Sequence, residues 1–206
     1  MIPAAEALER LREGNRRFVA EQREDAAAGR IRRREVAAAQ EPFAIILGCS
    51  DSRVPAEIVF DQGLGDLFVI RVAGNIVAPS QIGSVEFAIE RFHVRLVIVL
   101  GHTQCGAILA TIEELRRPTA ARSRNLRSIV SRIRPAVSKL VLSRPPLAHD
   151  ALVHSAVRAN IRASSDHLRR GSPVLEEAIG ENGLLVVGAE YSLETGEVDF
   201  FDGVPG

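Results

Sequence analysis

Residues 43–53 read Phe-Ala-Ile-Ile-Leu-Gly-Cys-Ser-Asp-Ser-Arg, an apolar run that ends in a cluster of polar side chains. Two further apolar runs of similar length occupy residues 67–72 and 96–100. Apolar strands that are continuous rather than alternating are typical of a sheet that helices cover on both faces. The three runs therefore predict buried strands of an α/β sheet.

Segments with helical spacing lie between these runs and after them. Residues 54–60 and 80–91 are predicted helices, and Ser80 is the expected N-cap of the second. Pro135 is expected to kink or break the helix that contains it. Strands that alternate with helices predict an α/β fold with a central, mostly parallel sheet flanked by helices and an added C-terminal strand. The other predicted elements are helices at 107–116, 126–141, 153–168 and 175–179, and paired strands at 184–191 and 198–201.

The first 40 residues differ in character from the rest of the chain. Residues 4–20 carry apolar side chains at helical spacing, whereas residues 21–40 are charged and rich in alanine. Because this part has too little apolar surface for a core of its own, we divide the chain into two parts. Residues 1–40 form an N-terminal helical arm that is expected to pack on a neighbouring subunit, and residues 41–206 form a single α/β domain. A partly frayed extension is the alternative for the arm.

The composition argues against several classes of function. The 206 residues include 26 Lys and Arg and 26 Asp and Glu, which disfavours nucleic acid or a membrane surface as the main partner. No apolar run approaches the roughly 18–20 residues of a membrane span, and residues 1–17 lack the apolar centre of a signal peptide. A reducing cytoplasm is therefore expected, and it leaves the two cysteines as free thiols or metal ligands.

Both cysteines follow predicted strands. Cys49 comes after the first run, and His102 and Cys105 come after the run at 96–100, with the spacing C-x52-H-x2-C. Ligands of open α/β sheets bind beyond the carboxyl ends of the strands. If the two strands are parallel neighbours, the three side chains meet at one edge of the sheet. Two thiolates and one imidazole suit Zn²⁺, and three protein ligands leave the fourth tetrahedral position for water, as in catalytic zinc sites.

Asp51 and Arg53 are two residues apart in a presumed extended loop, so their side chains can point the same way. Zinc with two thiolates is formally neutral, and its water is therefore less acidified than on a zinc with three histidines. We expect Asp51 to accept the proton of the zinc-bound hydroxide and to direct its lone pair toward the substrate. Arg53 would keep Asp51 ionised and in place.

Each of these residues also has a simpler interpretation. Isolated cysteines such as Cys49 and Cys105 are usually small buried apolar residues. Asp51 could be only a helix N-cap, Arg53 only a solvated charge, and His102 only a hydrogen-bonded residue near a turn. Five suitable groups after two predicted strand ends favour the metal site.

At these residues the sequence resembles the β-class carbonic anhydrases. The similarity is strong over residues 40–110 and loose over most of the remainder, and it includes Cys49 to Val54, Arg71 to Asn75 and Gly101 to Ala107. The resemblance implies reversible hydration of carbon dioxide to bicarbonate and a proton, with one Zn²⁺ per subunit. It also implies a homodimer or a dimer of dimers in which N-terminal helices embrace the partner.

The resemblance further implies a role for each matching residue. Cys49, His102 and Cys105 match the zinc ligands, and Asp51 and Arg53 match the catalytic pair. An apolar wall at the dimer interface suits uncharged carbon dioxide, and a glutamine there could donate a hydrogen bond to its oxygen. The matching substrate-binding positions are Gln40, Phe68, Phe87 and Gly106.

Some members of that family carry a second, regulatory bicarbonate pocket made of a tryptophan, an arginine and a tyrosine. Arg71 and Tyr191 match two of these positions, but Ile46 stands where the tryptophan would be. In those members the counterpart of Asp51 can move onto zinc at low pH. We expect the form with Asp51 off the metal for this chain near and above neutral pH.

Two other functions fit the same residues. A relative of the family could hydrolyse carbon disulfide or carbonyl sulfide at such a site. A structural or redox-sensing zinc protein could use Cys49 and Cys105 without catalysis, and it predicts that the substitution Asp51→Asn leaves function intact.

Overall fold

A computed structural model describes residues 2–22, 30–118 and 123–205 of the chain. Its strands form one sheet in the order β2-β1-β3-β4-β5. The pairs β1–β2, β1–β3 and β3–β4 are parallel, and β5 closes the sheet antiparallel to β4. This arrangement confirms the predicted class, a mostly parallel sheet with an added C-terminal strand. The strands are β1 Ala44–Gly48, β2 Leu67–Arg71, β3 Leu96–His102, β4 Leu185–Tyr191 and β5 Val198–Asp202.

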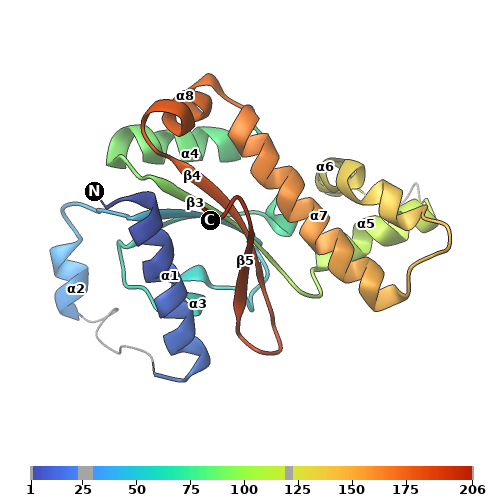
Figure 1. Cartoon of the computed structure of the whole chain (residues 1–206), viewed down its shortest axis with the longest axis horizontal. Coiled ribbons are helices and arrows are strands. Elements are labelled where there is room, and N and C mark those ends of the chain that lie inside the picture. Colours follow the sequence, from blue (N-terminus) through green and yellow to red (C-terminus); the bar gives the residue numbers. More distant parts are fainter. Residues whose placement is uncertain (1, 23–29, 119–122, 206) are drawn as a thin grey trace.

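Helices cover both faces of the sheet, which makes three layers (Figure 1). One face packs against α1 and α3, and the other packs against the helices from α4 to α8. Every residue of β1 and β3 is buried, which explains why these strands read as unbroken apolar runs. The helices are α1 Ala4–Val19, α2 Arg30–Glu35, α3 Ala56–Val59, the 3₁₀ turn η2 Ala73–Asn75, α4 Pro79–Phe92, α5 Gly106–Arg116, α6 Arg124–Val141, α7 His149–Arg170 and α8 Pro173–Glu181.

Three local expectations are corrected by the structure. Ser80 is not an N-cap, because α4 already begins at Pro79, whose missing N–H suits the first helical turn. Helix α6 runs through Pro135 without a break, held by buried Val130, Ile133 and Val137 on its inner face. Helix α3 is shorter than residues 54–60, since the proline at position 55 keeps the preceding residue out of helical conformation.

The first helix of the predicted arm packs on its own chain. Ala7, Leu8 and Leu11 of α1 are buried against the sheet, and burial of each leucine contributes about 1.5–3 kcal/mol. The Asn15 amide donates to Val59 O at 3.1 Å and to Gly196 O at 2.9 Å, and so ties the helix to α3 and the β4–β5 turn. The remainder of the arm lies partly outside the described residues. Packing of residues 1–40 on a neighbouring subunit stays a prediction.

Among the described helices, none combines the length and the apolar composition needed to cross a membrane.

The turn η2 depends on a glycine, and this dependence can be tested. Gly74 has φ 73°, and a Cβ at this position would lie 2.8 Å from Ile133 Cδ1 and 2.9 Å from Ala107 Cβ. We therefore expect Gly74→Ala to lower the free energy of unfolding by about 1–3 kcal/mol in urea titrations. Gly83→Ala is the control. Gly83 lies inside α4, and a Cβ at this position would have no neighbouring atom within 4 Å. This variant should raise stability by about 0.5–1 kcal/mol, and equal destabilisation by both variants would contradict the argument.

Candidate metal centre

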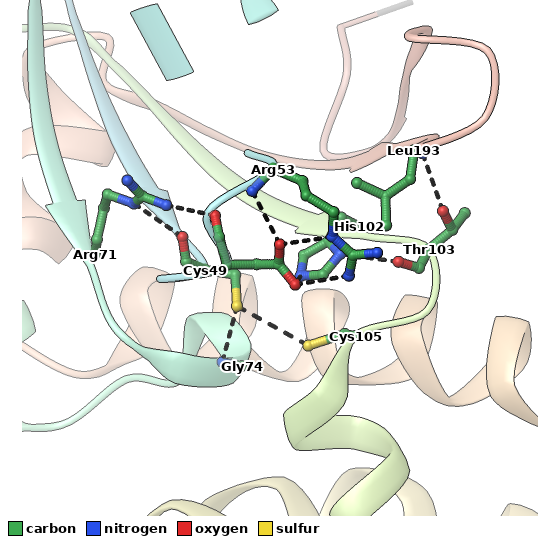
Figure 2. Close-up of polar contacts among 9 residues, drawn as sticks. Cys49, Arg53, Arg71, Gly74, His102, Thr103, Cys105 and Leu193 are labelled. Atoms are coloured by element: carbon green, nitrogen blue, oxygen red, sulfur yellow. Dashed lines mark hydrogen bonds and ion pairs between the residues drawn. The ribbon is translucent and has the colours of Figure 1, made fainter. Parts of the chain in front are cut away.

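Cys49, His102 and Cys105 converge at the carboxyl ends of the two central strands (Figure 2). Cys49 directly follows β1, His102 is the last residue of β3, and Cys105 precedes the first residue of α5. Because β1 and β3 are parallel and in register from Ile45 with Val97 onward, their carboxyl ends lie side by side. The three ligand atoms all lie within 4.8 Å of one another.

The geometry of the two sulfurs fits a zinc ion. Cys49 Sγ and Cys105 Sγ are 4.0 Å apart, and both cysteines are free and buried. A disulfide would require a separation of about 2.05 Å. Two thiolates at about 2.3 Å from a tetrahedral zinc would lie about 3.8 Å apart. The observed separation therefore matches two ligands of one metal ion.

The imidazole of His102 is oriented for the same position. Its Nδ1 lies 2.8 Å from Thr103 O, and since a carbonyl oxygen only accepts, Nδ1 donates this hydrogen bond. Its Nε2 is fully buried and has no hydrogen-bond partner in the described part of the chain. A buried, unpartnered nitrogen with a free lone pair, directed at two thiols, is what a metal ligand requires. The residues present therefore fit zinc.

The thiols and the imidazole share their protons unequally. A hydrogen bond from the Cys105 thiol lowers the pKa of Cys49 to about 4 against the effect of burial, with help from His102 and the Gly74 N–H. The pKa of Cys105 is raised because its proton is held by the Cys49 thiolate and because it is buried. Burial lowers the pKa of His102, but the Cys49 thiolate outweighs it and the net shift is upward. The hydrogen bond between the two sulfurs therefore favours the thiolate at Cys49 and the thiol at Cys105.

Asp51 and Arg53 form a tight pair beside the cluster. Asp51 Oδ1 accepts from the Arg53 backbone N–H at 3.0 Å and from Nε at 2.9 Å, and Oδ2 accepts from Nη2 at 2.8 Å. These contacts with Arg53 hold the pKa of Asp51 well below its usual range. Asp51 Oδ2 lies 3.9 Å from His102 Nε2, farther than the about 3.3 Å between two tetrahedral zinc ligands with bonds of about 2.0 Å. The carboxylate therefore lies beside the Cys49–His102–Cys105 cluster, with both oxygens hydrogen-bonded to Arg53.

Two supporting residues were not found by reasoning from the sequence. Arg71, at the end of β2, donates from Nε to Cys49 O at 3.0 Å and from Nη2 to Asp51 O at 2.6 Å, and so fixes the loop after β1. The Gly74 N–H donates to Cys49 Sγ at 3.3 Å (Figure 2). The arginine at the end of an apolar strand was a signal for the first, but the family resemblance associates Arg71 only with a regulatory pocket.

The predicted substrate-binding residues are not gathered at the metal position of one chain, apart from Gly106, which follows Cys105. Phe68 is in register with Ile45, four residues before Cys49 and hence about 13 Å away along the sheet. Its ring lies 6.2 Å from that of Phe87, which is 53% exposed. Gln40 lines a separate surface pocket of about 470 Å³. Their role in the reaction therefore stays a prediction that requires a second subunit.

In this chain, the residues at the positions of the family's regulatory pocket pack in the core or support a loop. Ile46 is fully buried in the core, and Arg71 donates a hydrogen bond to Cys49 O in the loop after β1. Tyr191 is 6% exposed, and its ring lies 6.5 Å from that of Phe18.

The burial of Tyr191 can be tested by titrating its phenol with increasing pH. Burial raises the pKa of Tyr191, so the folded protein keeps the phenol protonated where the unfolded chain ionises. Stability should be insensitive to this group below about pH 10 and should fall as pH rises beyond it. Because the chain has one tyrosine and no tryptophan, ultraviolet absorbance of the phenolate reports this residue alone. A midpoint no higher in the folded protein than in urea would contradict the burial of the hydroxyl.

The fold and the site together define an α/β protein with two cysteines and one histidine gathered, in an arrangement that could hold a metal ion, at the carboxyl edge of a parallel sheet. A sequence profile of the carbonic anhydrase family matches residues 44–198. Carbonic anhydrase 2 of Mycobacterium tuberculosis is 38% identical over 189 residues, which cover 90% of this chain and 87% of that protein. The carbonic anhydrase of Mycolicibacterium smegmatis is 37% identical over 192 residues, 92% of this chain and 89% of that protein.

Solved structures of β-carbonic anhydrases have a similar fold. The β-carbonic anhydrase CafA of Aspergillus fumigatus has a TM-score of 0.74 at 26% identity, over 84% of this chain and 81% of that chain. A structure from work on two tetrameric β-carbonic anhydrases of Sordaria macrospora has a TM-score of 0.70 at 24% identity, over 82% and 84%. The chain belongs to the β-class carbonic anhydrase family and is an enzyme, a carbonate dehydratase.

Proposed function

We propose that this enzyme hydrates carbon dioxide to bicarbonate and a proton, reversibly, at one Zn²⁺ per chain held by Cys49, His102 and Cys105. The observation that carries the proposal is the convergence of two free thiols with a buried, unpartnered His102 Nε2. Bound zinc would supply a Lewis acid that makes water nucleophilic near neutral pH. Three protein ligands leave room for that water and distinguish the centre from a closed structural site.

Asp51 has the role of aiming the attacking water. Its carboxylate is ionised, because Arg53 binds both oxygens, and it can accept a hydrogen bond from the nucleophile. Accepting that hydrogen bond leaves a lone pair of the nucleophile free to attack carbon. Arg53 and the Arg71 contacts to the loop keep the carboxylate in this position. The same contacts support a resting form in which Asp51 stays off the metal near and above neutral pH.

A second copy of the chain would complete the substrate pocket. Phe68 and Phe87 would form the apolar wall for carbon dioxide, and Gln40 would donate a hydrogen bond to its oxygen. The exposed ring of Phe87, grouped with Phe68 and Phe92, supports a homodimer or a dimer of dimers. The relatives from Sordaria macrospora are tetrameric. Two reduced thiols at the site are consistent with a reducing compartment such as the cytoplasm.

Stopped-flow hydration of carbon dioxide, with zinc content measured on the same sample, tests the proposal. One zinc per chain with hydration that is first order in enzyme is the expected result. One zinc per chain without activity at pH 8–9 would contradict it. The same sample is also assayed with carbon disulfide and carbonyl sulfide, which tests the alternative hydrolase activity. Hydrolysis of these compounds without hydration of carbon dioxide would contradict the proposal and support the alternative.

A further inference from the structure

A chain of buried hydrogen bonds connects helix α7 to the sulfur of Cys49. The Asn160 amide nitrogen donates to Gly74 O at 2.8 Å, across 86 residues of sequence. The Gly74 N–H in turn donates to Cys49 Sγ at 3.3 Å (Figure 2). Asn160 is 2% exposed, and Gly74 and Cys49 are also buried. Because these contacts are buried, each one constrains its partner strongly.

The conformation of the Gly74 turn determines where its N–H points. The carbonyl that accepts from Asn160 and the N–H that donates to Cys49 belong to neighbouring peptide planes joined at the Gly74 Cα. Glycine is the most permissive residue in φ and ψ, so it does not fix their relative orientation by itself. Gly74 lies at φ 73°, and the next residue, Asn75, is at φ 42°.

Rotation about the Gly74 Cα is restricted by its neighbours. Ile133 and Ala107 pack closely on Gly74. In the same turn, Asn75 N donates to Val72 O at 3.0 Å. Within this restricted turn, a partner that holds the carbonyl also holds the direction of the N–H.

We propose that Asn160 is a positioning residue for the metal ligand Cys49, and that it acts through Gly74 by keeping the N–H on the sulfur. The proposal rests on the proposed function of Cys49 as a zinc ligand. A hydrogen bond to a thiolate withdraws electron density from sulfur, so the ligand donates less charge to the metal. With two thiolates on one zinc, this withdrawal makes the metal a stronger Lewis acid.

The experiment compares the wild-type chain with Asn160→Leu, which removes the donor and keeps a side chain branched at Cγ, and with Asn160→Ala. The second variant guards against misfolding, because Asn160 lines a surface pocket of about 210 Å³ and a smaller side chain there can be hydrated. Ser165→Ala is the control, since Ser165 is fully buried on the same helix and its hydroxyl has no partner in the described residues. Each protein is loaded with cobalt(II), and its thiolate-to-cobalt charge-transfer band is recorded. Zinc affinity is measured by competition with a chelator, and hydration kinetics are measured on the zinc forms.

Loss of the N–H contact raises the energy of the sulfur electrons, so the charge-transfer band of the Asn160 variants should move to longer wavelength. Their zinc affinity should fall about 10–100-fold, because Cys49 is no longer held in place and its thiolate loses a hydrogen bond that favours it over the thiol. Ser165→Ala should change neither quantity. A merely structural role for Asn160 would lower stability but leave the band in place.

Two outcomes separate this inference from the proposed function. If the wild-type chain binds zinc and hydrates carbon dioxide while both Asn160 variants keep the wild-type band and affinity, the role of Asn160 is wrong and the function stands. If the wild-type chain binds neither zinc nor cobalt, both are wrong.

Discussion

Replacing Asp51 by asparagine, Asp51→Asn, is expected to slow carbon dioxide hydration about 10²–10⁴-fold while zinc stays bound. The amide keeps the size of the carboxylate but lacks its negative charge, and it can turn a donor instead of an acceptor toward the nucleophile. The ligand atoms of Cys49, His102 and Cys105 are untouched, so the zinc content should equal that of the wild type. Stopped-flow hydration and zinc analysis on one sample measure both quantities.

The chain offers a matched control in Asp202→Asn. The side chain of Asp202 is 18% exposed, as is that of Asp51, and it pairs with Arg169 at 2.8 Å on the edge strand β5. Asp202→Asn should lower the free energy of unfolding by a small amount, similar to the effect of Asp51→Asn, because each substitution removes one partly exposed ion pair. It should leave the hydration rate unchanged. Wild-type hydration in Asp51→Asn would overturn the aiming role. Absence of hydration in both the wild type and Asp51→Asn, with zinc bound, would favour a zinc protein without catalysis.

Loss of a ligand should have the second large effect. In His102→Ala the only nitrogen of the cluster is gone, and two thiols alone bind zinc more weakly and without the tetrahedral arrangement. We expect the purified variant to contain little zinc and its hydration rate to fall to the uncatalysed background. Because His102 is fully buried, the variant also leaves a cavity, and its folding should be checked by circular dichroism.

His154→Ala controls for the general loss of a histidine, since the His154 side chain is 59% exposed on α7 and lies outside the cluster. It should retain zinc and activity. A folded His102→Ala protein with a full complement of zinc would show that other residues hold the metal.

The sheet could be predicted because its central strands are buried on both faces. That burial makes 43–48 and 96–100 continuously apolar, and the helices between them leave few topologies open. Local details were less accessible. The start of α4 at Pro79 and the passage of α6 through Pro135 depend on tertiary packing that outweighs the local preference of single residues.

The site likewise has a part that the sequence predicted and a part that depends on tertiary contacts. The sequence indicated that Cys49, His102 and Cys105 would meet, since parallel neighbouring strands place their carboxyl ends together. It did not reveal Asn160, because a hydrogen bond across 86 residues leaves no trace in local spacing. Nor could it position Phe68 and Gln40 relative to the metal, because they lie toward the opposite end of the strands in the same chain.

The contacts that shape the site also set an order on its assembly during synthesis. Thr103, which follows His102 at the end of β3, accepts a hydrogen bond from Leu193 N on Oγ1, across 90 positions of sequence, and donates one from its backbone N to Tyr191 O. At ribosomal rates of about 5–20 residues per second, the proposed ligands His102 and Cys105 therefore emerge roughly 5–18 s before the segment that fixes them. A nascent chain that meets zinc in this interval would bind it through flexible thiols. The contacts that fix the end of β3 beside the cluster can form only once residues 191–193 have been translated.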